Sequence, residues 1–282
     1  FLENFAIPDW PLDDQIRIAR LLGKVEGLIA QRKQHLQQLD DLLKSVFLEM
    51  FGRFDEWPSR SLSAIAVDGK GTFSNGPFGR DLLTSELMDT GVPVIYIRDI
   101  REARYERVST VYVTEEKALA LSACLVQPGD ILVAKVGDPP GTTAIYPKGE
   151  PVGVVTQDVI RLRPNTGIVN AEFVVSFLNS HIGCRLIHGI TVEATRARFG
   201  LREFKMQEIP VPPINLQIKF AAIVEKVKSL RSRYQRSLID LESLYGALSQ
   251  QAFKGELDLS RVPLPGTQPE EKKVVTVELQ GR

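Results

Sequence analysis

Eight polar and basic side chains in the middle of the chain have the chemistry needed to read a nucleic acid. Arg can pair with guanine and Asn with adenine through two hydrogen bonds each, while Thr and Lys can hold phosphate groups. These residues flank a glycine-rich segment, end two apolar runs, or lie in TVEATRARFGLREFK (191–205), which carries four basic and two acidic residues. Taken singly, each is more often a solvated surface residue. Whether they form a binding site therefore depends on the elements that position them. The eight are Ser74, Asn75, Arg80, Arg98, Lys135, Thr195, Arg196 and Arg198.

Three other segments resemble catalytic motifs but lack an essential part of each. GDPPG (137–141) is close to the Asp-Pro-Pro-aromatic tetrad of DNA amino-methyltransferases, but Gly141 replaces the ring that stacks on a flipped base. GKGTFSNGPFG (69–79) lacks the Lys-hydroxyl ending of a phosphate-binding loop and is interpreted as a flexible surface loop. EFK (203–205) has the carboxylate-x-Lys form of many nucleases without an assignable metal-binding acid upstream. We therefore predict no catalytic residue.

The bulk composition limits the class of protein. The 282 residues include 35 basic and 35 acidic side chains, and this zero net charge argues mildly against a protein that binds a duplex unaided. No apolar run approaches the roughly 18 residues of a membrane helix. Two cysteines and three scattered histidines fit neither a disulfide framework nor a zinc spacing. We therefore expect no metal site, no membrane partner and a reducing, cytoplasmic location.

One segment of the chain occurs twice. Residues 7–51 align without a gap with residues 209–253, a shift of 202 positions (209 − 7), and 13 of the 45 aligned residues are identical. Both copies begin with Ile-Pro-x-x-Pro and continue to a shared Gln, at Gln15 and Gln217. Two unrelated amphipathic helices could share leucines, but are not expected to share this start. The repeat therefore indicates two copies of one structural element.

Each copy has the pattern of one long helix. A Pro at or just before the first turn costs the helix no hydrogen bond. Apolar residues then recur at alternating steps of three and four, which is an a/d seam of about five heptads. A helix of about 38 residues spans roughly 57 Å, too long for one compact domain, so each copy is expected to pair with the other, antiparallel. Two surface helices of one bundle are the alternative. The seams are Leu22, Val25, Ile29, Leu36, Leu39, Leu43, Val46 and Met50, interrupted by Arg32, and Val224, Val227, Tyr234, Leu238, Leu241, Tyr245 and Leu248, interrupted by Arg231.

Residues 54–208, between the copies, have the pattern of an α+β domain. Short apolar runs alternate with Gly, Pro and Asn turns. We predict strands in 92–100, 108–113, 131–136 and 154–163, and helices around 81–89, 114–121 and 170–183. The predicted fold class is therefore α+β, with one domain inserted between two long helices that pair as an antiparallel coiled coil.

The same order of segments resembles the specificity (S) subunits of type I restriction–modification enzymes. The order and spacing of these segments are fairly specific. The residues that carry the resemblance are IPVPPINLQIKFAAIVEKV (209–227), ALSQQAFKGEL (247–257), Trp57 with Leu62, GPFG (76–79), GVPVIYIRDI (91–100), PGDILVAKVG (128–137) and TRARFGLREFKMQEIPVPP (195–213).

The resemblance implies a non-catalytic subunit that reads double-stranded DNA. Such subunits carry two target recognition domains, each reading half of a bipartite site, on helices that act as a spacer and dock methyltransferase (M) subunits. Motor-nuclease (R) subunits complete the complex. S-adenosylmethionine, ATP and Mg are expected on these partners and no cofactor in this chain.

This chain departs from that pattern because it contains one recognition domain. It begins with Phe1 rather than Met, and LENFAIP (2–8) looks like the end of a preceding domain. We therefore expect the C-terminal half of such a subunit, or a half-subunit that forms a self-dimer. The predicted domains are 1–6 (remnant of a preceding recognition domain), 7–53 (first spacer helix), 54–208 (target recognition domain), 209–259 (second spacer helix) and 260–282 (flexible C-terminal tail).

Two alternative functions remain open at this point. The chain could be a coiled-coil adaptor whose inserted domain binds a protein, in which case its affinity would lack the steep salt dependence of DNA binding. It could also be an autonomous DNA methyltransferase, an alternative that Gly141 disfavours.

Overall fold

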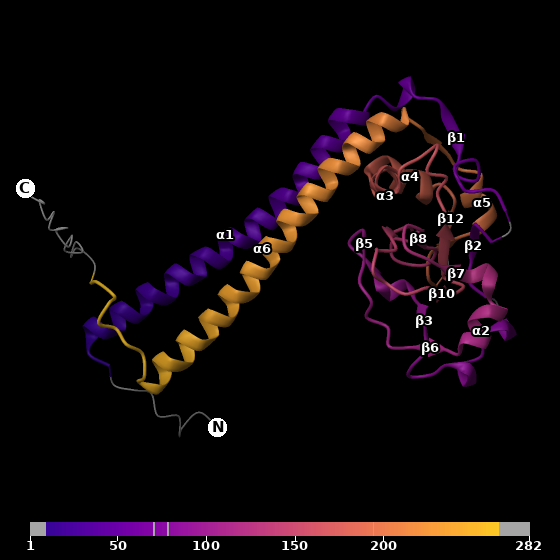
Figure 1. Cartoon of the computed structure of the whole chain (residues 1–282). Coiled ribbons are helices and arrows are strands. Elements are labelled where there is room, and N and C mark those ends of the chain that lie inside the picture. The colour runs from indigo at the N-terminus through magenta and orange to yellow at the C-terminus, as the bar shows by residue number, and fades with distance from the viewer. Residues whose placement is uncertain (1–9, 70, 78, 194, 265–282) are drawn as a thin grey trace, which may run out of the picture. The chain divides into compact units, whose positions relative to one another are not determined.

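The computed structural model describes residues 10–69, 71–77, 79–193 and 195–264 (Figure 1). The predictions on 1–6 and on the tail beyond 264 lie outside these residues. The chain divides into two compact units. The helical unit comprises Phe1–Asp40 with Lys228–Arg282, and the sheet unit comprises Asp41–Val227.

Two helices of 40 and 41 residues form where the repeat predicts them, α1 (Leu12–Phe51) and α6 (Ile214–Lys254). Each begins directly after a proline, whose carbonyl accepts the first helical hydrogen bonds. The carbonyl of Pro11 accepts from the backbone N–H of Asp14, and that of Pro213 from the N–H of Leu216, both at 2.9 Å. Within the described residues, neither these helices nor any other has an apolar stretch long enough to cross a membrane.

The two helices run antiparallel and side by side in the helical unit (Figure 1). Three polar pairs show the direction, because residue numbers rise along α1 as they fall along α6. The pairs are Glu26 with Tyr245 (2.6 Å), Lys33 with Glu242 (3.1 Å) and Asp40 with Arg231.

Apolar residues fill the seam between the helices in the helical unit. Val25, Leu36, Leu39 and Leu238 are buried there, as are Val224 and Val227 in the sheet unit. Every other predicted seam residue is partly covered. Arg32, which interrupts the seam, places its guanidinium 4.6 Å from the centre of the Tyr234 ring. The predicted antiparallel coiled coil is therefore confirmed.

Two four-stranded sheets form the centre of the sheet unit. The first has the order β2-β11-β8-β9 and is antiparallel, whereas in the second, β6-β3-β10-β7, strands β3 and β10 run parallel. The first contains β2 (Phe73–Asn75), β11 (Val159–Leu162), β8 (Ile131–Ala134) and β9 (Thr143–Ile145). The second contains β6 (Tyr112–Val113), β3 (Val92–Ile95), β10 (Gly153–Val155) and β7 (Leu125–Val126).

Three short strand pairs complete the sheet unit. They are β1 (Ser59–Ser61) with β14 (Glu208–Pro210), β4 (Ile100–Arg101) with β5 (Arg104–Tyr105), and β12 (Thr191–Val192) with β13 (Arg198–Phe199). The α-helices are α2 (Glu115–Ala120), α3 (Ala171–Leu178), α4 (His181–His188) and α5 (Leu201–Lys205). The 3-10 turns are η1 (Phe54–Glu56), η2 (Gly79–Asp81), η3 (Thr84–Glu86), η4 (Ile97–Asp99) and η5 (Ser122–Cys124).

Successive side chains of a strand point to opposite faces of the sheet. Both faces of the first sheet are buried, each in a different core. Ile131 and Val133 of β8 belong to one core, together with Phe173 of α3. Leu132 lies on the other face, in a second core shared with Val154 of the second sheet. An α+β domain thus lies in sequence between two long helices, as predicted.

Several of the expected elements differ from the structure. The expected strand 92–100 consists of β3, the turn η4 and the first residue of β4, and only Tyr112 and Val113 of the expected strand 108–113 form a strand. Residues 81–89 hold the end of η2 and the turn η3 instead of a helix, because the carboxylate of Glu86 accepts the backbone N–H of Leu83 (2.7 Å) in place of a helical bond. Residues 170–183 hold α3, which ends at Leu178, and the start of α4, which Ser180 caps. The expected strand 154–163 is two strands of different sheets, and the supposed loop 69–79 contains β2.

A charge placed in the helical seam should unpair the helices. Leu238 is 7% exposed, so Leu238→Asp buries a carboxylate without a partner and should lower the free energy of unfolding by about 3–5 kcal/mol, measured by urea denaturation. The neighbouring Ile239 is 57% exposed, and Ile239→Asp should change the same quantity by about 1 kcal/mol or less. Equal losses in the two variants would contradict the seam.

Candidate nucleic-acid interface

A turn at residues 156–158 (the 156–158 turn) joins the ends of strands from both sheets. The carbonyl of Ile95, at the end of β3, accepts bonds from the backbone N–H and the hydroxyl of Thr156, both at 3.0 Å. The N–H of Gly76, just after β2, donates to the carbonyl of Thr156 at 3.2 Å. The N–H of Lys135, just after β8, donates to the backbone carbonyl of Asp158 at 2.8 Å. The segments that follow β2, β3 and β8 therefore leave the domain at one edge.

The hairpin of β12 and β13 is attached to the same edge. Val136 pairs with Arg198, and the N–H of Gly137 donates to the carbonyl of Ala197 at 3.2 Å. Phe199 is buried and packs on Phe204 with ring centres 5.2 Å apart. This ring anchors the hairpin in the core, whereas its polar tip faces outward.

Four of the eight predicted residues come together on this hairpin and the adjoining strand end. The side chains of Thr195, Arg196 and Arg198 are exposed, and that of Lys135 is partly covered. Burial lowers the pKa of Lys135; the carboxylate of Asp158 opposes this and the charge of Arg198 adds to it. An anion bound beside Lys135 and Arg198 would relieve the repulsion between these two cations.

Arg98 lies on η4, in the segment that follows β3. Its Nε donates to the hydroxyl of Ser109 at 2.7 Å, and its guanidinium lies 4.6 Å from the centre of the Tyr96 ring. Asp99, which is fully buried, fixes this segment by accepting three backbone N–H groups, from Tyr96, Val108 and Ser109. Arg98 is therefore exposed but held in one orientation.

Ser74 and Asn75 are used inside the domain. The hydroxyl of Ser74 donates to the carbonyl of Ala123 at 2.8 Å, and Asn75 is buried and donates to the carbonyl of Gln157 at 3.3 Å. Both lie on β2 rather than in a loop. Arg80 lies in η2, and its side chain is outside the described part of the chain.

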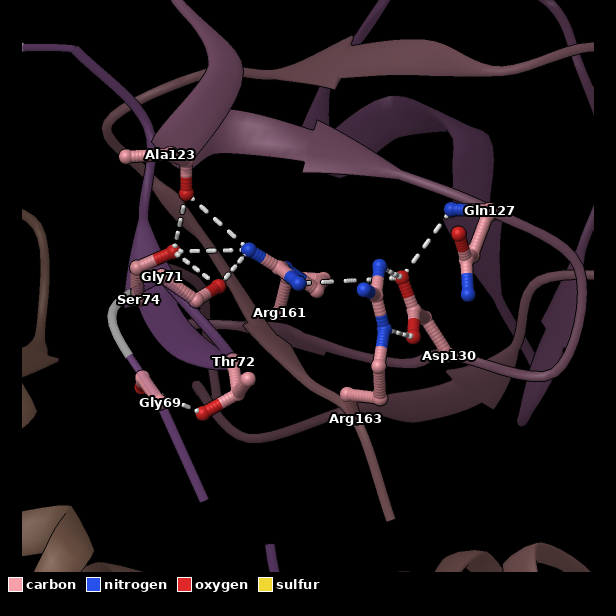
Figure 2. A network of polar contacts seen from close by, with 9 residues as sticks. All are labelled: Gly69, Gly71, Thr72, Ser74, Ala123, Gln127, Asp130, Arg161 and Arg163. Atoms are coloured by element: carbon pink, nitrogen blue, oxygen red, sulfur yellow. Dashed lines mark hydrogen bonds and ion pairs between the residues drawn. The ribbon is translucent and has the colours of Figure 1, made fainter. Parts of the chain in front are cut away.

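A buried ionic network that no local sequence pattern indicates supports the first sheet (Figure 2). Asp130 is 1% exposed and accepts two bonds from Arg163, at 2.8 and 2.9 Å, and one from the N–H of Gln127 at 3.0 Å. Arg161 is 2% exposed and lies 3.9 Å from the same carboxylate. One carboxylate therefore compensates two guanidinium groups.

Arg161 also ties three segments together. Its Nη2 donates to the hydroxyl of Ser74 at 3.2 Å, to the carbonyl of Ala123 at 3.0 Å and to the carbonyl of Gly71 (Figure 2). Burial lowers the pKa of Arg161 and the charge of Asp130 raises it. The network thus fixes the segment that leads into β2.

Among the described residues, no three His, Cys, Asp or Glu side chains gather as they would around a metal ion.

Comparison with known proteins gives matches among solved structures. No protein-family model and no curated protein matches the chain. The fold is similar to that of the HsdS subunit from Thermoanaerobacter tengcongensis, with a TM-score of 0.51 and 16% identity over 86% of this chain and 58% of that one.

Two further structures are similar at lower scores. One is described as showing complex assembly and conformational transition of the type I R-M system (TM-score 0.49, 18% identity, 89% and 62% of the two chains). The other is the S subunit of the type I restriction–modification system of M. genitalium (0.47, 16%, 86% and 61%). The chain spans about three fifths of the length of these structures. The resemblance of this chain to specificity subunits is thus confirmed at the level of the fold.

Removing the charge of Asp130 should destabilise the sheet unit. Asp130→Asn leaves Arg161 and Arg163 without a compensating carboxylate and should lower the free energy of unfolding by about 3 kcal/mol, measured by urea denaturation. Asp55→Asn, at an exposed position, should change it by about 0.5 kcal/mol or less. An unchanged unfolding midpoint for Asp130→Asn would show that the network does not stabilise the domain.

Proposed function

We propose that this chain, which has the fold of an HsdS subunit, is a sequence-specific DNA-recognition subunit of a type I restriction–modification complex. The observation that carries this proposal is the edge at the 156–158 turn. There a hairpin anchored by Phe199 presents Thr195, Arg196 and Arg198 beside Lys135. Exposed guanidinium groups on a rigid support fit both base edges and phosphate groups.

The side chains at this edge are assigned different DNA contacts according to their exposure and their neighbours. Thr195 and Arg196, exposed at the hairpin tip, are the candidates for base contacts. Lys135 and Arg198, whose charges repel each other, are the candidates for a phosphate. Arg98 is held against Tyr96 and is a candidate for a further backbone contact. Ser74 and Asn75 support the edge from inside, and Arg80 keeps its predicted role as a contact.

The absence of catalysis in this chain is part of the proposal. In a DNA amino-methyltransferase, an aromatic ring at the position of Gly141 would stack on the flipped base. Gly141 has a φ of +106°, and a Cβ atom there would lie 2.7 Å from the side chain of Ile187. A ring does not fit at this position, which disfavours the autonomous methyltransferase.

The remaining roles are expected from the fold that the chain shares with HsdS subunits. We propose that the chain reads one half of a bipartite target and that its paired helices dock methyltransferase subunits. Motor-nuclease subunits would join the complex, with S-adenosylmethionine, ATP and Mg bound by the partners. This assembly would act in the cytoplasm, where its DNA is.

Loss of the hairpin arginines should weaken and relax DNA recognition. In complex with a methyltransferase subunit, the chain should select a preferred sequence from random duplexes. Arg196→Ala should lower the affinity for that duplex by about 1–3 kcal/mol for the lost base contact and relax one position of the selected sequence. Loss of a phosphate contact by Arg198→Ala or Lys135→Ala should weaken all duplexes alike and reduce the salt slope by about one.

Matched variants separate this effect from general damage. Arg60 is exposed on β1, outside the edge, and Arg60→Ala should leave affinity and selected sequence unchanged. Ser74→Ala and Asn75→Ala should lower the melting temperature rather than change the sequence read. If none of the eight predicted residues altered DNA binding, the site would be wrong. Binding to a protein partner without salt dependence would instead support the coiled-coil adaptor.

A further inference from the structure

The segment GDPPG (137–141), which resembles a catalytic tetrad without its aromatic ring, lies at the edge formed around the 156–158 turn. It connects β8 to β9 and is held firmly where it enters β9. The N–H of Gly141 donates to the carbonyl of Ala134 at 2.7 Å, and the carbonyl of Gly141 accepts a bond from the hydroxyl of Thr143 at 2.8 Å. The segment is therefore a short loop on a fixed support.

Asp138 of this loop lies beside the tip of the β12–β13 hairpin. Val136 pairs antiparallel with Arg198, so residue numbers rise along the loop as they fall along the hairpin. Continuing this register by two residues places Asp138 opposite Arg196, the candidate for a base contact. Residues two apart on a strand point to the same face, so Asp138 follows the side of the loop that faces Arg198.

The carboxylate of Asp138 is open to a ligand. The side chain is exposed, and it makes no hydrogen bond or ion pair with any other residue that the structure describes. Asp158, another acidic residue of this edge, acts instead on Lys135, because its charge opposes the lowering of the pKa of that lysine. Asp138 is thus a negative charge presented to solvent among basic side chains.

A carboxylate at a DNA-binding edge is favourable only where it meets a hydrogen-bond donor of a base, because phosphate groups repel it. In the major groove these donors are the N4 amino group of cytosine and the N6 amino group of adenine. Adenine also presents its N7 acceptor beside N6, which would repel the second oxygen of a carboxylate. Cytosine has no acceptor beside N4 in this groove, so a carboxylate fits cytosine better.

We propose that Asp138 determines one position of the DNA target by accepting a hydrogen bond from N4 of a cytosine. Arg196, which lies opposite, would donate to O6 and N7 of the guanine paired with that cytosine. Two exposed side chains of opposite charge then match the donor and the acceptors of a single C·G pair. This inference rests on the proposed function and adds an acidic residue to a site of polar and basic side chains.

Selection from random duplexes tests the role of Asp138, with the chain in complex with a methyltransferase subunit. Asp138→Ala should lose selection at one C·G pair, the pair that Arg196→Ala also relaxes, and should bind the preferred duplex about tenfold more weakly. Its affinity for unrelated duplexes should rise by about twofold, because a charge that repels phosphate groups is removed. Damage to the fold would instead lower both affinities.

Two further variants separate direct reading from other effects. The amide in Asp138→Asn can bond to both N6 and N7 of adenine, so this variant should accept adenine in place of the cytosine. A residue that only oriented Arg196 would not produce this change. Asp89 is exposed and precedes β3, whereas the edge lies where β3 ends. Asp89→Ala should therefore leave both affinities and the selected sequence unchanged.

The outcomes distinguish this inference from the proposed function. If the unaltered chain selects a sequence and both Asp138 variants select the same one, the inference is wrong and the proposed function stands. Lost selection at a pair other than C·G, or an equal rise of both affinities, would also overturn the inference. If the unaltered chain selects no sequence, the proposed function is wrong and the inference falls with it.

Discussion

A junction of three phenylalanine rings and one glutamine amide attaches the domain to its helices. Phe51 lies 4.9 Å from Phe173 and 5.5 Å from Phe220, measured between ring centres. Burying each ring contributes about 1.5–3 kcal/mol, but rings alone do not fix an orientation. The amide of Gln217 does, because leaving it without partners would cost about 1–3 kcal/mol. Within the sheet unit, the helix ends and α3 therefore have one mutual arrangement.

Burial of the first sheet on both faces decides where recognition can occur. With one core on either side, its central strands offer no face to a ligand. The ends of the strands remain, and the 156–158 turn brings several of them together. Gly76 shows how tightly this edge is built, because a Cβ atom there would lie 2.0 Å from the carbonyl of Val155. The exposed arginines of the hairpin extend from a support that cannot easily deform.

The spacing of apolar residues along the chain predicted the long helices and their seam. The long helices and their seam follow from spacings of three and four residues, and both formed as expected. The apolar runs indicated where strands lie but not which strands pair. VVTQDVIRLR (154–163) contributes to two sheets, and the polar Thr-Gln-Asp within it was the available signal of a break between two strands. Pairing of Asp130 with Arg163 joins residues 33 positions apart, which no local pattern reveals. The same holds for Asn75, whose polar side chain is satisfied inside the domain.

Arg32, which interrupts the apolar seam between the helices, has a structural role that the sequence repeat explains. A shift of 202 positions relates Arg32 to Tyr234, and these two residues contact each other. In an antiparallel pair of related helices, a residue meets its own counterpart only where an approximate two-fold axis passes. Arg32 and Tyr234 therefore mark that axis, with Asp40 and Arg231 paired to one side. A polar layer at a fixed point of a seam specifies register at some cost in stability. Here the register decides which residues of α1 and α6 meet, among them Lys33 with Glu242 and Asp40 with Arg231.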